Sequence, residues 1–287
     1  MTIIKILILA IIQGTAELLP VSSSGHVIVV EKLLGLDPTK PEMTLLLVML
    51  HTGTMFATIF FYWESWKISF FSSWNSFLTF SKLAAVATTF TGIVGLSLKL
   101  VIEKIIRRSV PSAEIEMLFG NLKLISVSLA AVGMLIIYAG CKKYPQQNKH
   151  HAISLMGSCL IGIVQGVCLP FRGFSRSGAT ISTGIALGFQ RKQVEEFSFA
   201  LAVVMTPPII VREILRLTHA QKFGLISGCT TLELYLPSLA GMVLSFATGL
   251  LALKWLSAWL QNGRWYIFGI YCGCASFFVL ILSYNNI

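Results

Sequence analysis

The sequence has few charged residues. Only 12% of its 287 residues are Asp, Glu, Lys or Arg, which is about half the share in a typical soluble domain. Apolar and aromatic residues make up 55% of the chain, and the mean hydropathy is +0.78. These values exclude an ordinary soluble globular protein and indicate an integral membrane protein.

The chain also lacks the cysteine patterns of a disulfide-rich protein. Its six cysteines lie mostly inside apolar segments, and no two of them have CxxC spacing. Buried cysteine behaves as a small apolar residue. We therefore expect the cysteines to fill space in the interior, without disulfides.

A basic face interleaved with aromatic residues is also missing, although the formal net charge is +10. The Lys and Arg residues are spread over loop segments, where anionic lipid headgroups attract them. Membrane lipids are therefore the expected partners of these charges, and nucleic acid is not expected to bind.

Long apolar segments are abundant, and most of them are uninterrupted. A spanning helix needs about 20 apolar residues. The segments that meet this requirement are Met43–Trp63, Leu83–Ile102, Leu118–Cys141, Phe197–Leu217, Leu232–Leu256 and Trp265–Ser283. Two others, Ile3–Leu34 and Ile153–Leu187, are interrupted by Gly, Pro, Ser and charged residues. We predict an all-α integral membrane protein with about six spanning helices and two broken, re-entrant helix-loop-helix segments.

The two broken segments resemble each other. IIQGTAELLPVSSSGH at 11–26 and IVQGVCLPFRGFSRSGAT at 163–180 share an apolar pair, Gln-Gly, Pro and Ser-x-Ser-Gly in the same order. Three predicted spanning helices separate them, and an odd number would invert one half relative to the other. We expect one membrane domain, 1–287, built from repeats of about 1–150 and 151–287. Paired interrupted segments of this kind indicate a binding site near the membrane midplane.

The first interruption carries the polar groups of a candidate anion site. Gln13 and Glu17 are four residues apart and share a helix face, and Pro20 then ends the helix. Three consecutive serines at 22–24 follow at the start of a new helix, whose free N–H groups attract anions. Glu17 indicates a functional site, because a carboxylate inside an apolar segment is costly unless it is paired.

The second interruption adds a cation. Arg176 lies between Ser175 and Ser177 at another predicted helix start. A guanidinium can bind phosphate through two parallel hydrogen bonds, and an Arg at membrane depth needs such a partner. The two helix starts, the Arg and the serines together predict a phosphate pocket.

Other polar residues have simpler interpretations. His51 is interpreted as a packing residue, and Glu195 and Glu196 as the solvated start of a helix. The six tryptophans are expected at the membrane interface: Trp63, Trp66, Trp74, Trp255, Trp259 and Trp265.

Two motifs resemble sequence blocks of a known protein family. The first, QGTAELLPVSSSGH, resembles a (Glu/Gln)xxxGlu block with its following Pro-x-Ser-Ser-x-Gly-His, and the second, RGFSRSGAT, resembles a Pro-Gly-x-Ser-Arg-Ser block. Both belong to the bacterial undecaprenyl-diphosphate phosphatase family associated with bacitracin resistance. HTGT and EFSFALAV are also similar to that family, so the resemblance covers nearly the whole chain. It implies an enzyme of the bacterial cytoplasmic (inner) membrane that hydrolyses a polyprenyl diphosphate to the monophosphate and recycles this carrier for peptidoglycan synthesis. It also implies dependence on a divalent cation and a pocket that opens to the outer face.

The resemblance, together with the polar groups described above, gives the expected site. The expected catalytic residues are Glu17, Ser23, His26 and Arg176. The expected substrate-binding residues are Ser22, Ser24, Ser175, Ser177 and Thr180. Gln13 and Glu17 are expected to bind Mg²⁺ or Ca²⁺, since hard cations prefer oxygen ligands. Ser23 activated by His26 is the preferred nucleophile, and direct attack by His26 and water activated by Glu17 are the alternatives.

Arg172 departs from the family pattern, which usually has Pro at this position. We expect its side chain at the pocket mouth, and a second phosphate clamp is the alternative. A secondary transporter would share the inverted repeat but release its substrate unchanged. The acid-phosphatase-like membrane phosphatases are excluded, because position 182 is Ser where they need His and the chain has no Arg-Pro dipeptide. A homodimer stays open.

Overall fold

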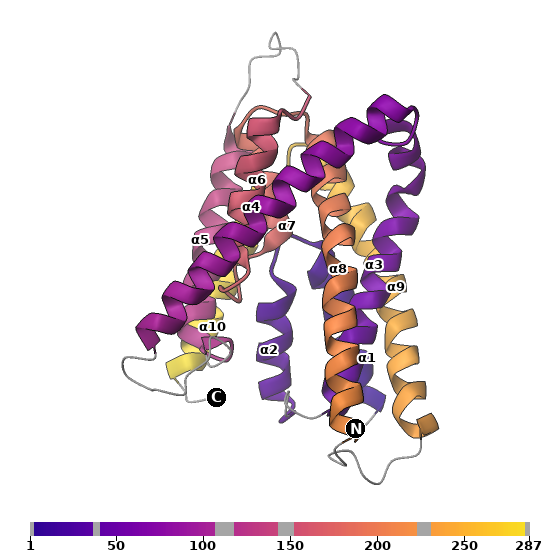
Figure 1. Ribbon diagram of the computed structural model, residues 1–287. Helices are drawn as coiled ribbons and strands as arrows, with labels where there is room; N and C mark the ends of the chain where they lie inside the picture. The colour runs from indigo at the N-terminus through magenta and orange to yellow at the C-terminus, as the bar shows by residue number, and fades with distance from the viewer. Residues whose placement is uncertain (1–2, 37–40, 107–117, 143–151, 223–230, 285–287) are drawn as a thin grey trace.

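The computed structural model describes residues 3–36, 41–106, 118–142, 152–222 and 231–284 (Figure 1). These residues form helices and no strand, so the all-α fold is confirmed. In chain order the helices are α1 (Ile3–Leu18), α2 (Ser23–Leu33), α3 (Pro41–Ser69), α4 (Trp74–Ile106), α5 (Leu122–Cys141), α6 (Leu155–Cys168), α7 (Arg176–Ala186), α8 (Arg191–Lys222), α9 (Thr231–Gln261) and α10 (Tyr266–Tyr284).

Five helices of the described part are long and apolar enough to cross a membrane: α3, α4, α5, α9 and α10. The chain is therefore a multi-pass membrane protein. The sixth expected span corresponds to α8, which is not among the five. The spanning role of this segment stays a prediction, because side chains in the second half of α8 lie partly outside the described residues.

Both interrupted segments form helical hairpins, as predicted. α1 ends shortly before Pro20 and α6 ends shortly before Pro170, since the residue before a proline disfavours helical geometry. In Figure 1 the α1–α2 hairpin extends from one end of the molecule and the α6–α7 hairpin from the other. Their tips are in contact, because Ser177 Oγ donates to the carbonyl of Leu19 at 3.2 Å.

Each hairpin is packed against one long helix through the glycine of its Gln-Gly pair. α1 packs on α9, and α6 packs on α4. A Cβ on Gly14 would lie 2.7 Å from the carbonyl oxygen of Ser245, and one on Gly166 would lie 2.9 Å from that of Thr91. Only glycine allows so close a backbone contact. α1 of the first predicted repeat thus packs on α9 of the second, and α6 of the second packs on α4 of the first. An inverted repeat would produce this reciprocal packing, although the repeat boundaries stay a prediction.

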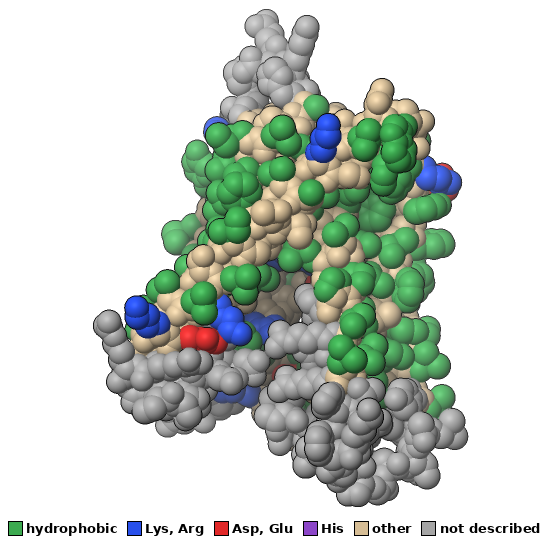
Figure 2. Space-filling model, viewed as in Figure 1, with side chains coloured by type: hydrophobic (Ala, Val, Ile, Leu, Met, Phe, Trp, Pro, Cys, Tyr) green, Lys and Arg blue, Asp and Glu red, His purple; other side chains and the backbone are tan. Residues whose placement is uncertain are grey.

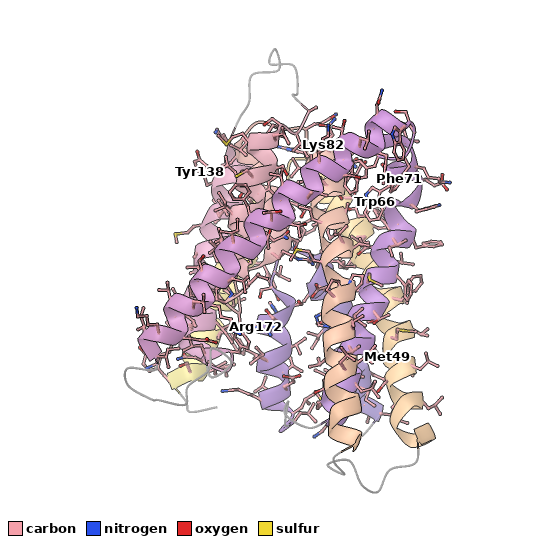
Figure 3. All side chains as sticks on the ribbon, viewed as in Figure 1. Met49, Trp66, Phe71, Lys82, Tyr138 and Arg172 are labelled. Atoms are coloured by element: carbon pink, nitrogen blue, oxygen red, sulfur yellow. The ribbon has the colours of Figure 1, made fainter. Side chains whose placement is uncertain are left out.

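The outer surface suits a lipid environment. Figure 2 shows hydrophobic side chains spread over the face formed by α4, α8 and α3, with Lys and Arg toward its upper and lower ends. Trp74 and Trp255 are exposed, in agreement with an interfacial position. Trp66, near the upper end of α3 in Figure 3, and Trp265 are instead buried in the main apolar core, so their side chains pack against protein and not against lipid.

Candidate active site

The carboxylate of Glu17 is the centre of the candidate site. Its Oε2 accepts hydrogen bonds from Gln13 Nε2 at 3.2 Å and from Ser23 Oγ at 2.5 Å. Its Oε1 accepts from Arg176 Nη2 at 3.1 Å. The structure therefore brings together four of the predicted residues, three from the first hairpin and one from the second.

Glu17 and Arg176 are both largely removed from water. Their side chains are 18% and 26% exposed. A charge in a low-dielectric environment is tolerated when an opposite charge and hydrogen bonds compensate it. Both carboxylate oxygens have such partners, so the pair holds a negative and a positive group at the hairpin tips without an uncompensated charge.

The two hairpins begin their second helices in the same way. Ser22 caps α2 and its Oγ accepts from the N–H of Gly25 at 3.3 Å, while Ser175 caps α7 and accepts from Gly178 at 3.2 Å. Ser22 has φ +68°, the only positive value for a non-glycine residue in the described part of the chain. Such a conformation is unfavourable and is often found at functional sites. The helix starts thus direct N–H groups toward the tips, beside Glu17 and Arg176.

The remaining predicted hydroxyls make contacts of other kinds. Ser24 Oγ lies 3.5 Å from that of Ser22. Ser177 binds the first hairpin through Leu19. Thr180 is fully buried, and its Oγ1 donates to the carbonyl of Arg176 at 2.8 Å and lies 2.5 Å from Ser198 Oγ. Ser177 and Thr180 therefore fasten α7 to its neighbours, and their substrate-binding role stays a prediction.

His26 is not hydrogen-bonded to Ser23. Its Nδ1 donates to the carbonyl of Ser22 at 2.8 Å, and its Nε2 accepts from the hydroxyl of Tyr271 at 2.8 Å. Ser23 instead donates to Glu17. The expected bond between Ser23 and His26 is therefore absent here, and the catalytic role of His26 stays a prediction that requires a change of partner.

His51 is a site residue that the sequence interpretation missed. Its Nε2 lies 3.9 Å from Glu17 Oε2, and its Nδ1 donates to the carbonyl of Leu47 at 2.8 Å. A small cavity beside Glu17 is lined by Glu17, Leu18, His51, Thr54, Met55, Thr58, Arg176, Ala202, Val203 and Thr206. His51, like Glu17, is a polar residue inside an apolar segment, and this signal in the sequence could have identified it.

Glu195 and Glu196 are buried, so their interpretation as a solvated helix start is wrong. Tyr62 donates to Glu195 Oε1 at 2.6 Å. Ser65 and Ser69 donate to the two oxygens of Glu196 at 2.5 and 2.8 Å. The hydroxyls of α3 provide these partners, which the sequence around the two carboxylates could not reveal. The contacts fasten the start of α8 to α3.

Arg172 lies beside α2 in Figure 3. Its guanidinium is 4.4 Å from the ring centre of Phe119 and interacts electrostatically with Glu31 of α2. A cation over an aromatic face is a favourable arrangement. Arg172 therefore has different contacts from Arg176, as a position of Arg172 outside the phosphate clamp would require.

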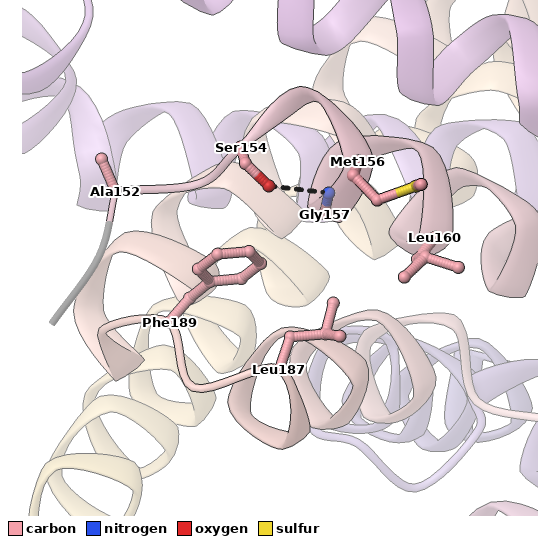
Figure 4. A pocket seen from close by; sticks show the side chains of 7 residues that line it. All are labelled: Ala152, Ser154, Met156, Gly157, Leu160, Leu187 and Phe189. Atoms are coloured by element: carbon pink, nitrogen blue, oxygen red, sulfur yellow. Dashed lines mark hydrogen bonds between the residues drawn. The ribbon is translucent and has the colours of Figure 1, made fainter. Parts of the chain in front are cut away.

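A larger hollow lies at the open end of the second hairpin (Figure 4). Its lining residues are Ala152, Ser154, Met156, Gly157, Leu160, Leu187 and Phe189. Ser154 Oγ accepts from the N–H of Gly157 at 3.1 Å and so caps α6. None of these side chains is titratable, so we place the chemistry at Glu17 and not here.

The oxygen atoms of Glu17 and Gln13 show whether these two residues suit a divalent cation. In the described part of the chain no three His, Cys, Asp or Glu side chains form a cluster, so a cage made by the protein alone is not present there. Mg²⁺, however, is commonly held by one or two carboxylates while substrate phosphates provide other oxygens. Glu17, with the amide oxygen of Gln13, fits a cation that binds together with a phosphate.

Comparison with known proteins gives a consistent result. A family described as bacitracin resistance protein BacA matches residues 6–278. Undecaprenyl-diphosphatase 2 of Acinetobacter baylyi is 56% identical over 286 residues, covering 99% of both chains. Undecaprenyl-diphosphatase of Bacteroides fragilis is 30% identical over 283 residues, covering 96% of this chain and 97% of the relative. The hairpins, the residues at their tips and these matches agree, and the chain belongs to the bacitracin resistance protein BacA family.

Proposed function

We propose that this chain hydrolyses undecaprenyl diphosphate to undecaprenyl phosphate and inorganic phosphate. The observation that carries the proposal is the contact of Glu17 with Ser23 and Arg176 at the meeting point of the two hairpins. The printed names of the relatives give the substrate. Hydrolysis of a diphosphate needs charge neutralisation, an aligned nucleophile and management of a proton, and these residue types provide all three.

Arg176 supplies the charge neutralisation. A guanidinium carries five N–H donors, so Arg176 can hold Glu17 and bind phosphate oxygens at the same time. The free N–H groups at the starts of α2 and α7 add further donors. Placed where negative charge develops, such donors stabilise the transition state more than the substrate.

Ser23 is the nucleophile in this proposal. Its Oγ attacks the terminal phosphorus, its proton passes to a base, and the bond to the bridging oxygen breaks, so that undecaprenyl phosphate leaves. Water then hydrolyses the phosphoserine, which releases phosphate and restores the hydroxyl. The 2.5 Å bond to Glu17 supports this assignment because it holds the hydroxyl in place. His26 as the base must first exchange Tyr271 for Ser23; direct attack by His26 and water activated by Glu17 stay the alternatives.

A divalent cation is part of the proposal. Glu17 and Gln13 would hold Mg²⁺ or Ca²⁺ together with the diphosphate, and the bound cation would supply additional neutralisation of phosphate charge. In the cell the reaction would recycle the lipid carrier for peptidoglycan synthesis in the cytoplasmic membrane and confer bacitracin resistance. The pocket is proposed to open to the outer face.

Release of phosphate by the purified protein tests the proposal. The protein in detergent is incubated with undecaprenyl diphosphate, with and without a chelator, and Arg176→Ala serves as the inactive control. We expect phosphate release that depends on protein, on Arg176 and on a divalent cation. Absence of release by the wild-type protein under all cation conditions would overturn the phosphatase assignment, and release that the chelator leaves unchanged would overturn the cation.

A further inference from the structure

Both ring nitrogens of His26 have partners, and together these partners define the tautomer. A backbone carbonyl only accepts hydrogen bonds, so Nδ1, 2.8 Å from the carbonyl of Ser22, carries the proton. Nε2 therefore presents its lone pair, and the hydroxyl of Tyr271 donates to it at 2.8 Å. The two rings are nearly parallel, with 14° between their planes and 5.7 Å between their centres. The imidazole is thus held in one tautomer and one orientation.

The neighbouring residue gives α10 a second contact with the first hairpin. Cys272 is fully buried, and its thiol donates to the carbonyl of Pro20 at 3.4 Å. Pro20 lies in the turn that precedes Ser22 and α2. Tyr271 and Cys272 therefore connect α10 to the turn and to the first residues of α2, where Ser23 and His26 are located.

α10 is itself held firmly against α5. A Cβ on Gly133 would lie 3.0 Å from the carbonyl oxygen of Gly269, and one on Gly269 would lie 2.6 Å from that of Gly133. Backbones in such close contact leave little room for one helix to slide along the other. The position of the Tyr271 hydroxyl is therefore set by a rigid helix pair and not by the mobility of a loop.

Packing alone does not explain Tyr271. Its side chain is 47% exposed, in contrast to Cys272, which is inaccessible. A half-exposed phenol contributes less burial than a core residue, whereas its hydroxyl makes a hydrogen bond of good length to the basic nitrogen of an expected catalytic residue. The hydroxyl is the part of this side chain that matters for the site.

We propose that Tyr271 is a positioning residue for His26 in the hydrolysis of undecaprenyl diphosphate. Its O–H bond holds Nε2 of His26 as the unprotonated nitrogen and keeps the ring in one orientation between turnovers, until Nε2 exchanges Tyr271 for Ser23. The proposal rests on the proposed function and adds a residue of α10 to a site otherwise built from the two hairpins.

Kinetics of Tyr271→Phe test the effect on the reaction. Removal of the hydroxyl leaves the ring and its packing but frees Nε2 of His26. We expect kcat to fall about tenfold while KM stays within about twofold, because substrate contacts are kept and only the alignment of the imidazole is lost. Tyr266→Phe is the matched control, since it removes a hydroxyl from the same helix, and its kinetics should equal those of the wild type.

The nitrogen resonances of His26 provide a readout that activity does not affect. Protein labelled with ¹⁵N in the imidazole rings is compared with Tyr271→Phe, and the signals of His26 are assigned from their loss in His26→Gln. We expect Nε2 of His26 to shift toward the value of an unbonded nitrogen in Tyr271→Phe, with Nδ1 unchanged. Tyr266→Phe should leave both signals in place.

An unchanged or raised kcat in Tyr271→Phe, or an unchanged Nε2 signal, would overturn the positioning role. A rise in KM with kcat preserved would also overturn it, because that pattern indicates substrate binding. Failure of the wild-type protein to release phosphate would instead refute the proposed function, whereas the resonance experiment would still report on the bond between Tyr271 and His26.

Discussion

Arg176 and Glu17 are 159 residues apart in the chain, yet Nη2 of the first lies 3.1 Å from Oε1 of the second. Each belongs to a different hairpin, and the two hairpins extend from opposite ends of the molecule (Figure 1). Each hairpin alone would expose a charge to an apolar environment, which is costly. The ion pair therefore joins the two hairpin tips, since the first hairpin contributes the negative charge and the second contributes the positive charge.

The first prediction concerns the geometry of the Arg176 side chain. Arg176→Lys keeps the positive charge but removes the planar pair of donors that matches phosphate. We expect kcat to fall at least about a hundredfold, near the roughly 3 kcal/mol that follows loss of one preorganised donor. Phosphate release measures this effect, and Arg264→Lys is the control with unchanged activity. Near-normal hydrolysis by Arg176→Lys would contradict the assignment of Arg176 as the phosphate clamp.

The second prediction separates cation binding from proton transfer. Glu17→Gln keeps an oxygen ligand but loses the charge, so raised Mg²⁺ or Ca²⁺ should partly restore phosphate release. His26→Ala removes the group expected to act as base or nucleophile, so no cation concentration should restore it. Activity is measured for both variants across a cation titration. Equal rescue of both variants would mean that the two roles cannot be assigned separately.

The third prediction concerns Arg172. It contacts Phe119 and interacts electrostatically with Glu31, so we expect that its charge is not needed for the chemistry. Arg172→Pro should keep turnover within about tenfold, or roughly 1.4 kcal/mol, with slightly weaker apparent affinity for the anionic lipid. The measurement is kcat and KM for Arg172→Pro and Arg172→Ala. Loss of hydrolysis in both, as complete as in Arg176→Ala, would establish a two-arginine clamp.

The fourth prediction concerns stability. A Cβ on Gly162 of α6 would lie 2.3 Å from the carbonyl oxygen of Ala87 on α4, whereas one on Gly92 of α4 would meet nothing within 4 Å. Gly162→Ala should therefore force the helices apart and lower stability by about 1–3 kcal/mol. Gly92→Ala, the matched control, should be neutral or stabilising by up to about 1 kcal/mol. Thermal unfolding in detergent measures both, and an unchanged midpoint for Gly162→Ala would show that α4 and α6 are not in close contact.

The sequence predicts much of the fold, because its strongest signals are local. Apolar length predicts the long helices, and Pro20 and Pro170 predict where α1 and α6 end. The carboxylate of Glu17 and the serines before α2 and α7 are identified in the same way. These features depend on neighbours in the chain, which the sequence displays directly.

The parts that could not be predicted depend on partners from distant segments. Glu195 and Glu196 resemble a solvated helix start until the hydroxyls of α3 provide hydrogen bonds for them. His26 follows the serines in the sequence, yet its basic nitrogen is bound by Tyr271, which is 245 residues away. Spacing along the chain does not specify such contacts, because they arise only when the hairpins and long helices pack together.

The fate of the lipid is the most direct test of the central claim that the hairpin tips form a hydrolytic site. Purified wild-type protein and Arg176→Ala are incubated with undecaprenyl diphosphate and a divalent cation. The extracted lipids are then separated and quantified, and their molar amounts are compared with that of the phosphate released. We predict that the wild type forms undecaprenyl phosphate and phosphate in equal amounts, while Arg176→Ala leaves the undecaprenyl diphosphate unreacted. Recovery of intact undecaprenyl diphosphate from the wild type would contradict the account and favour a transporter.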